Sequence, residues 1–177
     1  MEEVKKLKIL GAILILIATS GLGFFGGMQL SRRVRELESL RNDFVFLEME
    51  INYNATPLPQ IFKKLKSINA QDSNSLWDKL LVVLNDGEGI STEEAWRRAL
   101  EIFCQKSSLT KDDILILKDF GLGLGSTSRQ EQLKKFKLIQ ELLQIRQQDA
   151  LTKKQKNQRM WRSMGLLGGL ALIILLC

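Results

Sequence analysis

Between two apolar ends, the hydrophobic residues of this 177-residue chain recur every three or four positions, and no convincing strand-like alternation is present. The spacing and the polar breaks between segments predict an all-α bundle of about six helices, of which the first and last are the longest. The predicted helices cover 31–54, the apolar positions Leu58 to Ile68, 75–85, Trp96 to Phe103, Ile114 to Phe120, and a final segment from 129 toward the C-terminus.

The helix predicted over 31–54 is apolar on two sides. One stripe follows three- and four-residue steps through Val34, Leu37, Leu40, Phe44, Leu47 and Ile51. Phe46, Met49 and Tyr53 form a second patch on roughly the opposite side. Such a helix is usually central in a bundle or shared with another subunit. Glu48, at the edge of the first stripe, is either a solvated boundary charge or one half of an ion pair between helices or subunits.

Local signals mark the helix ends. Thr56 is a good N-cap and Pro57 suits the first helical position, because its missing N–H has no partner there. Ser128 is predicted to cap the last helix with Glu131 reaching back, and the segment from Thr110 to Asp113 is predicted to cap the short helix before it. The preceding loop has three alternating glycines that end at Gly125, but no Gly-Lys-Ser/Thr and no strand before it, so a phosphate-binding loop is not expected.

Both ends of the chain are predicted to be transmembrane helices. No charged residue lies between Lys8 and Arg32, so a helix over 9–30, after a tail of residues 1–8, is long enough to cross the hydrocarbon core. The 15 residues of 163–177 are also uncharged, although at 1.5 Å each they span only roughly 23 Å. The segment 31–162 is then a helical domain held at the membrane. Each apolar segment contains a glycine pair that lets helices approach closely in lipid: Gly23 and Gly27, and Gly165 and Gly169.

The net charge of +6 is concentrated at the predicted membrane borders. Arg32, Arg33 and Arg35 follow the first apolar segment, and a run of five basic residues without acids precedes the second: Lys153, Lys154, Lys156, Arg159 and Arg162. The positive-inside rule and anionic headgroups explain this pattern better than nucleic acid does, and they place the domain in the cytoplasm.

The sequence offers no catalytic or cofactor-binding set. It has no histidine and two cysteines, which removes the commonest general base, the usual zinc sites and a disulfide framework. No nucleophile with a neighbouring base is found, so we expect neither an enzyme nor a bound metal or cofactor. The alternatives that remain open are a membrane-bound enzyme or metal protein, and a membrane-surface adaptor or sensor that uses the basic borders.

Three stretches together resemble a known family: Leu47-Glu48-Met49-Glu50-Ile51-Asn52-Tyr53 with Thr56-Pro57-Leu58, then Leu124 to Gln132, and Gly165-Leu166-Leu167-Gly168-Gly169. In this order, between two apolar ends, they resemble the stage III sporulation protein AB of endospore-forming bacteria. The family usually has Asp where this chain has Ser128, and both residues cap helices.

The resemblance implies a non-enzymatic membrane scaffold, similar to the helical cytoplasmic domain of the type II secretion and type IV pilus inner-membrane F protein. Its implied place is the mother-cell membrane that faces the forespore, within the channel complex of sporulation. The implied partners are a secretion-type ATPase (stage III sporulation protein AA), the membrane subunits of the channel, lipids and, as a homo-oligomer, further copies of itself. An adaptor or sensor unrelated to secretion is the alternative.

The candidate partner-interface residues are Glu48, Glu50 and Tyr53 on the first long helix and Gln132 on the last. A structural role is expected for Thr56, Pro57, Gly125 and Ser128.

Overall fold

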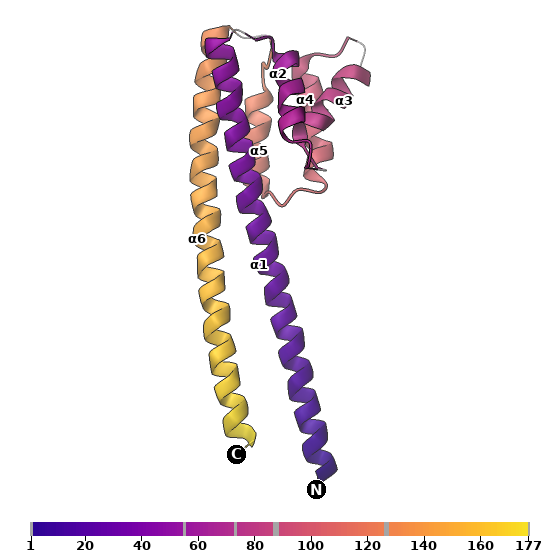
Figure 1. Ribbon diagram of the computed structural model, residues 1–177, viewed down its shortest axis with the longest axis vertical. Helices are drawn as coiled ribbons and strands as arrows, with labels where there is room; N and C mark the ends of the chain where they lie inside the picture. The colour runs from indigo at the N-terminus through magenta and orange to yellow at the C-terminus, as the bar shows by residue number, and fades with distance from the viewer. Residues whose placement is uncertain (1, 55, 73, 87–88, 126–127, 177) are drawn as a thin grey trace. The chain divides into compact units, whose positions relative to one another are not determined.

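The computed structural model describes residues 2–54, 56–72, 74–86, 89–125 and 128–176, and it describes side chains between 28 and 157 and at 160. Within these residues the chain forms six helices and no strand, which confirms the all-α prediction (Figure 1). The helices are α1 (Glu2–Tyr53), α2 (Leu58–Ile68), α3 (Leu76–Asp86), α4 (Thr92–Cys104), α5 (Lys111–Gly121) and α6 (Arg129–Leu176).

The chain divides into two units, one made of residues 33–149 and the other of the outer parts of α1 and α6. Among the side chains that the structure describes, no helix contains a stretch long and apolar enough to cross a membrane. The segments predicted to do so, 9–30 and 163–177, lie almost wholly outside those described side chains. The same holds for their glycine pairs, Gly23 with Gly27 and Gly165 with Gly169, so both membrane helices stay predictions.

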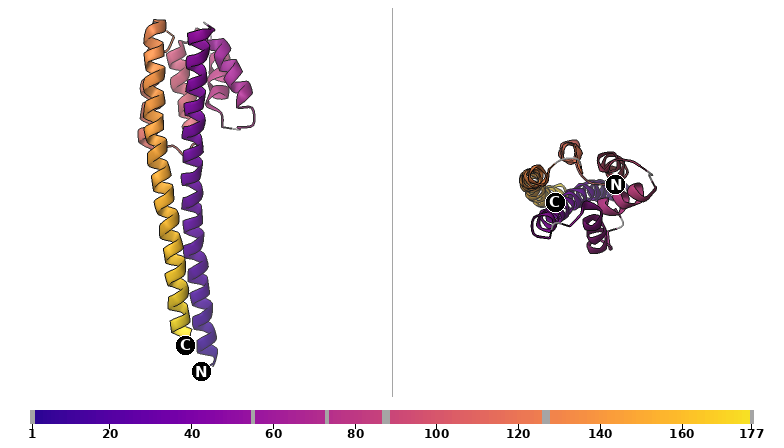
Figure 2. Two further views of the ribbon diagram at one scale, coloured as in Figure 1. Left: turned by 60° about the vertical axis from the view of Figure 1, so that its left-hand side comes forward. Right: turned by 90° about the horizontal axis from the view of Figure 1, so that it is seen from above.

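In the unit of residues 33–149, α1 lies in the middle, with α6 along one side and α2, α3 and α4 along the other (Figures 1 and 2). Each of the six helices contributes one ring to a connected aromatic core: Phe44, Phe62, Trp77, Trp96, Phe120 and Phe136. Ring centroids in this core are 4.7 to 6.3 Å apart, a range in which each pair adds about 0.5–1.5 kcal/mol beyond the burial of its area. The first predicted stripe of α1 is buried throughout, as expected for a central helix.

Gly121, the last residue of α5, lets that helix pack directly on α4. A Cβ at this position would lie 2.2 Å from Cδ1 of Trp96, far inside van der Waals contact. The same indole donates from Nε1 to the carbonyl of Leu117 at 2.8 Å. This hydrogen bond holds the ring against the backbone of α5, so a shift of the ring away from a larger residue would break it.

Most predicted caps are confirmed. Thr110 and Asp113 form a reciprocal capping box at α5, and the Ser128 hydroxyl and the Glu131 carboxylate bind each other's backbone N–H at α6. Gly125 has a φ of +87°, a conformation that L side chains rarely adopt, which gives the predicted structural role a physical cause.

The predicted capping of α2 by Thr56 is wrong. Helix α2 begins at Leu58, so Pro57 is the N-cap rather than the first helical residue, and no side chain caps it. The hydroxyl of Thr56 instead donates to Oε2 of Glu50 at 2.7 Å. The Glu50 carboxylate is buried one turn from the end of α1, so this hydrogen bond is charge-assisted and stronger than a neutral cap bond, and it ties the connecting segment to α1.

Candidate interaction site

A buried ion pair joins α1 to α5 where the unit of residues 33–149 begins. Arg33 donates from Nε to Oδ2 of Asp113 at 2.8 Å and from its other nitrogen, Nη2, to Oδ1 at 3.1 Å. The side chain of Arg33 is 5% exposed and that of Asp113 is fully buried. This two-point geometry fixes the guanidinium plane, which a single hydrogen bond would not do. It corrects the prediction that Arg33 belongs to a basic border facing lipid headgroups.

The last helix joins the same cluster. Arg146 of α6 lies with Nε 3.6 Å from Oδ1 of Asp113 and with Nη2 3.0 Å from Oδ2 of Asp112. Asp149 lies 3.7 Å from the Arg33 guanidinium. These five residues, Arg33, Asp112, Asp113, Arg146 and Asp149, are called the charged junction below. It links α1, α5 and α6 in the stretch where the two long helices enter and leave the unit.

The hydrogen bonds of the junction determine the charge of its central carboxylate. Burial by itself raises the pKa of Asp113, but hydrogen bonds from Arg33 and from Thr110 outweigh burial and hold the pKa below its usual value. The same hydrogen bond favours the charged form of Arg33 and therefore raises the pKa of its guanidinium. Both groups therefore stay ionised at neutral pH.

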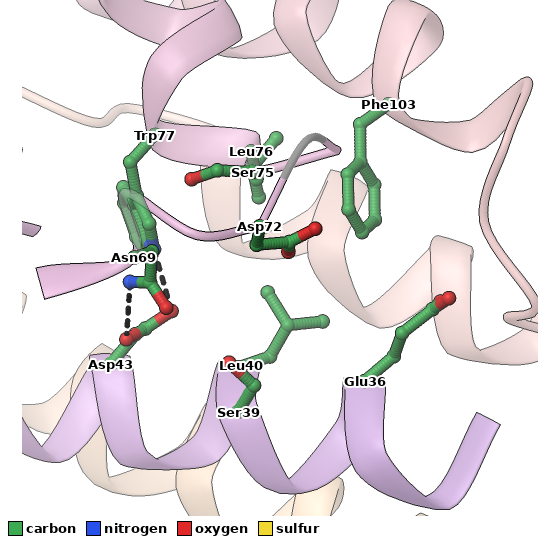
Figure 3. A pocket seen from close by; sticks show the side chains of 10 residues that line it. All are labelled: Glu36, Ser39, Leu40, Asp43, Asn69, Asp72, Ser75, Leu76, Trp77 and Phe103. Carbon is green, nitrogen blue, oxygen red and sulfur yellow. Dashed lines mark hydrogen bonds between the residues drawn. The ribbon is translucent and has the colours of Figure 1, made fainter. Parts of the chain in front are cut away.

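A second buried carboxylate, Asp43, lies on α1 and has neutral partners. Its Oδ2 accepts from Nε1 of Trp77 at 2.6 Å, and its Oδ1 accepts from the amide of Asn69 at 3.1 Å (Figure 3). Burial raises the pKa of Asp43, and the two hydrogen bonds only partly oppose that shift. These contacts tie α1 to α3 and to the segment that joins α2 and α3.

A small cavity lies beside Asp43. It measures about 20 Å³ and is lined by Asp43, Asp72, Ser75 and Phe103, among others (Figure 3). That volume accommodates one water molecule, and it is far below the size of a substrate pocket. The Ser75 hydroxyl, which lines the cavity, and the side-chain oxygen Oδ1 of the preceding Asn74 are buried and make no hydrogen bond within the protein. A water molecule in this cavity would give the Ser75 hydroxyl the hydrogen-bond partner that it lacks within the protein.

The four candidate interface residues differ in how far their side chains are exposed to solvent. Glu50 is buried and accepts from Lys64 and Thr56, which lowers its pKa. Glu48 is half-buried and accepts from the side chain of Gln140 on α6 at 2.8 Å. Tyr53 is 80% exposed, and Gln132 is half-buried on the first turn of α6. Tyr53 alone of the four presents most of its side chain to solvent, and the interface role stays a prediction for all of them.

The burial of Arg33, Asp113 and Asp43, and their role in holding helices together, were not predicted from the sequence. For Arg33 and Asp43, the positions along α1 already indicated burial. Arg33 lies four residues before Leu37 and Asp43 four before Leu47, so both share the buried stripe of α1. A charged residue on such a stripe needs a buried partner. The identity of that partner was beyond sequence reasoning, because Asp113 is 80 positions from Arg33.

Among the described residues, no group of three or more cysteine or acidic side chains is arranged to hold a metal ion. The buried ionised groups Arg33, Asp113 and Asp43 have hydrogen-bond partners within the protein, and the cavity beside Asp43 has room for about one water molecule. What the arrangement can do is hold helices in fixed positions and present the surfaces between them.

Comparison with known proteins identifies the family. The family model described as stage III sporulation protein AB matches residues 8–177. The chain belongs to this family. The stage III sporulation protein AB of Bacillus subtilis (strain 168) is 35% identical over 170 residues, which cover 96% of this chain and 99% of that protein. A solved structure of stage III sporulation protein AB matches with a TM-score of 0.64 and 30% identity, over 71% of this chain and 98% of its own. The resemblance seen in the three motifs is therefore confirmed, and with it a role in sporulation.

Proposed function

We propose that this member of the family is a membrane-anchored platform subunit that couples a cytoplasmic secretion-type ATPase to the channel between mother cell and forespore. The charged junction is the observation that carries the proposal. It fixes α1, α5 and α6 to one another by charge-assisted contacts at the two places where the long helices leave the bundle. A platform needs such a connection, because motion received by the short helices must reach both long helices together.

The uncharged stretches 9–30 and 163–177 support the membrane part of the proposal. With Arg33 buried, Arg32 and Arg35 remain exposed as basic residues after the first stretch, and Lys153 is exposed before the second. Basic residues on the domain side of both stretches favour a cytoplasmic bundle at the mother-cell membrane.

The test is direct binding between the full chain in lipid nanodiscs and the purified stage III sporulation ATPase of the same organism. We expect a dissociation constant in the micromolar range or tighter. The ATPase should fail to bind nanodiscs that carry an unrelated protein with two membrane helices. Absence of binding at micromolar concentrations, with lipid present, would contradict the platform role.

A cysteine-accessibility experiment in intact cells tests the orientation separately. A cysteine placed at exposed Asn52 should be labelled by a membrane-impermeant reagent only after the cells are opened. Labelling in intact cells would place the bundle outside the cytoplasm and remove any contact with a cytoplasmic ATPase.

A further inference from the structure

We infer that an exposed apolar surface shared by α1 and α2 is a docking site for an acidic amphipathic helix of a partner protein. The surface, called the α1–α2 apolar surface below, consists of Val45, Phe46, Met49, Tyr53 and Ile68. The inference deepens the proposed function, because it names where the platform receives a partner and what chemistry that partner presents.

Three of these residues form a line along α1. Val45, Met49 and Tyr53 are spaced by four positions and are 40%, 50% and 80% exposed. At 1.5 Å per residue the line is about 12 Å long, a little over two helical turns. Their neighbours on the other side of α1 are buried in the core, so this line is a second apolar face of the same helix. Contiguous apolar surface of this kind marks interaction sites in soluble domains.

The line borders a groove between α1 and α2. Phe46 of α1 and Ile68 of α2, together with Lys63, Lys64 and Ser67, line an open depression of about 500 Å³. Ile68 is 62% exposed at the last position of α2. A helix that lies along Met49 and Tyr53 can therefore place one apolar side chain in this groove, in the manner of helix-in-groove recognition.

The charge around the groove selects the partner. Both charged residues that line it are lysines. Lys64 is paired with Glu50 and Lys66 with Asp78, whereas no ion pair of the described residues involves Lys63. An acidic residue beside the apolar face of the partner helix would pair with Lys63, and a basic one would be repelled. Complementary charge of this kind adds specificity and association rate.

A second apolar stripe on the bundle provides the matched control. Leu138 and Ile145 of α6 are 56% and 60% exposed, comparable to Met49 and Ile68. None of the residues that line the groove comes from α6. If exposed apolar area alone were enough for binding, both surfaces would respond equally to substitution.

The experiment uses the full chain in nanodiscs and a fluorescent 18-residue helical peptide with leucines on one face and glutamates on the other. We expect the peptide to bind, and the combined Tyr53→Ser and Ile68→Ser substitutions to weaken binding at least tenfold. Leu138→Ser should change it less than twofold. Lys63→Glu should weaken it at least fivefold, and an otherwise identical peptide with lysines in place of glutamates should bind at least tenfold more weakly.

Equal binding of the two peptides, or equal effects of the α1–α2 and α6 substitutions, would overturn the inference. So would anionic phosphatidylglycerol vesicles that compete with the peptide, because the surface would then be a lipid-binding one. Binding of the ATPase is measured on the same variants. An ATPase that binds the Tyr53→Ser, Ile68→Ser protein normally refutes this docking site and leaves the platform role standing. Peptide binding without any ATPase binding supports the site and refutes the platform role.

Discussion

Two buried aspartates of the same bundle have opposite electrostatics. Asp113 accepts hydrogen bonds from a guanidinium and from the cap of its own helix, and its pKa lies below the usual value. Asp43 accepts from an indole and an amide, and its pKa lies above the usual value. Because both carboxylates lose most of their hydration, the difference comes from the charge of their partners.

The contrast separates two ways of joining helices. The charged junction uses ionised groups that need one another, so removing one member leaves an uncompensated charge in the interior. The Asp43 site uses neutral donors, and the nearby Asp72 carries charge of the same sign, so neutralising Asp43 leaves no buried opposite charge behind. We therefore expect the junction to tolerate substitution poorly and the Asp43 site to tolerate it well.

The largest effect is expected from Asp113→Ala. This change leaves Arg33, whose side chain is 5% exposed, without its two-point partner, and it also removes half of the capping box of α5. Breaking a buried ion pair from one side costs about 3–5 kcal/mol of unfolding free energy. Denaturant unfolding of the full chain in detergent measures it.

Asp112→Ala is the matched control, because Asp112 is 71% exposed and also pairs with Arg146. It should cost less than about 1 kcal/mol, as exposed pairs do. If both substitutions cost the same, burial does not set the strength of the junction.

Local features of this chain were predictable from sequence, and long-range pairings were not. The helices followed from apolar spacing, and the caps at Thr110 and Ser128 from residues within one turn of each other. The cap predicted for Thr56 at α2 was wrong because the hydroxyl of Thr56 binds Glu50, which lies on the preceding helix, α1. The partners of Arg33 and Asp43 depend on how helices pack, which no window of the sequence contains.

In the candidate interface, too, the local feature was predictable from the sequence and the long-range one was not. The second apolar patch of α1 was visible as spacing, and the structure leaves Met49 and Tyr53 exposed. The groove that continues this patch was not predictable, because Ile68 reaches it only through the antiparallel packing of α2 on α1.

The next effect in size is expected from Trp77→Phe. This change removes the 2.6 Å indole donor to Asp43 while it keeps an aromatic ring in the core. Loss of one partner of a buried acceptor costs about 1–3 kcal/mol. The cost should fall as the pH is lowered, because a protonated Asp43 no longer carries a charge. Thermal unfolding at pH 4 and pH 7 measures the difference, and a cost independent of pH would contradict this account of the site.

The two aspartates should also give opposite pH dependences of stability. The lowered pKa of Asp113 means that its contribution is present above its ordinary pKa near 4 and is lost as the pH falls through the lowered value. The raised pKa of Asp43 means that its contribution is full below the ordinary pKa and is lost as the pH rises through the raised one.

Asp43→Asn isolates the second of these dependences. The amide keeps an acceptor for Trp77, so the expected change at low pH is within about 1 kcal/mol. As the pH rises from 4 to 7, the variant should gain stability relative to the natural chain. The stability lost in Asp113→Asn should instead stay nearly constant over that range and shrink only as the pH falls below about 4. Parallel curves for the two variants, measured by urea unfolding in detergent, would show that the partners do not determine the charge states.

The smallest change in the free energy of unfolding is expected when an exposed ion pair, Lys66 with Asp78, is broken. Lys66 and Asp78 lie 2.6 Å apart, closer than Arg33 and Asp113, but their side chains are 51% and 47% exposed. Water screens such a pair and ordering the long lysine side chain opposes it, so Lys66→Ala should change the unfolding free energy by less than about 0.5 kcal/mol. The same urea titration, repeated at 0.5 M salt, should erase even that change while it leaves the cost of Asp113→Ala nearly intact. A loss comparable to the junction's would mean that distance rather than burial determines the strength of ion pairs in this bundle.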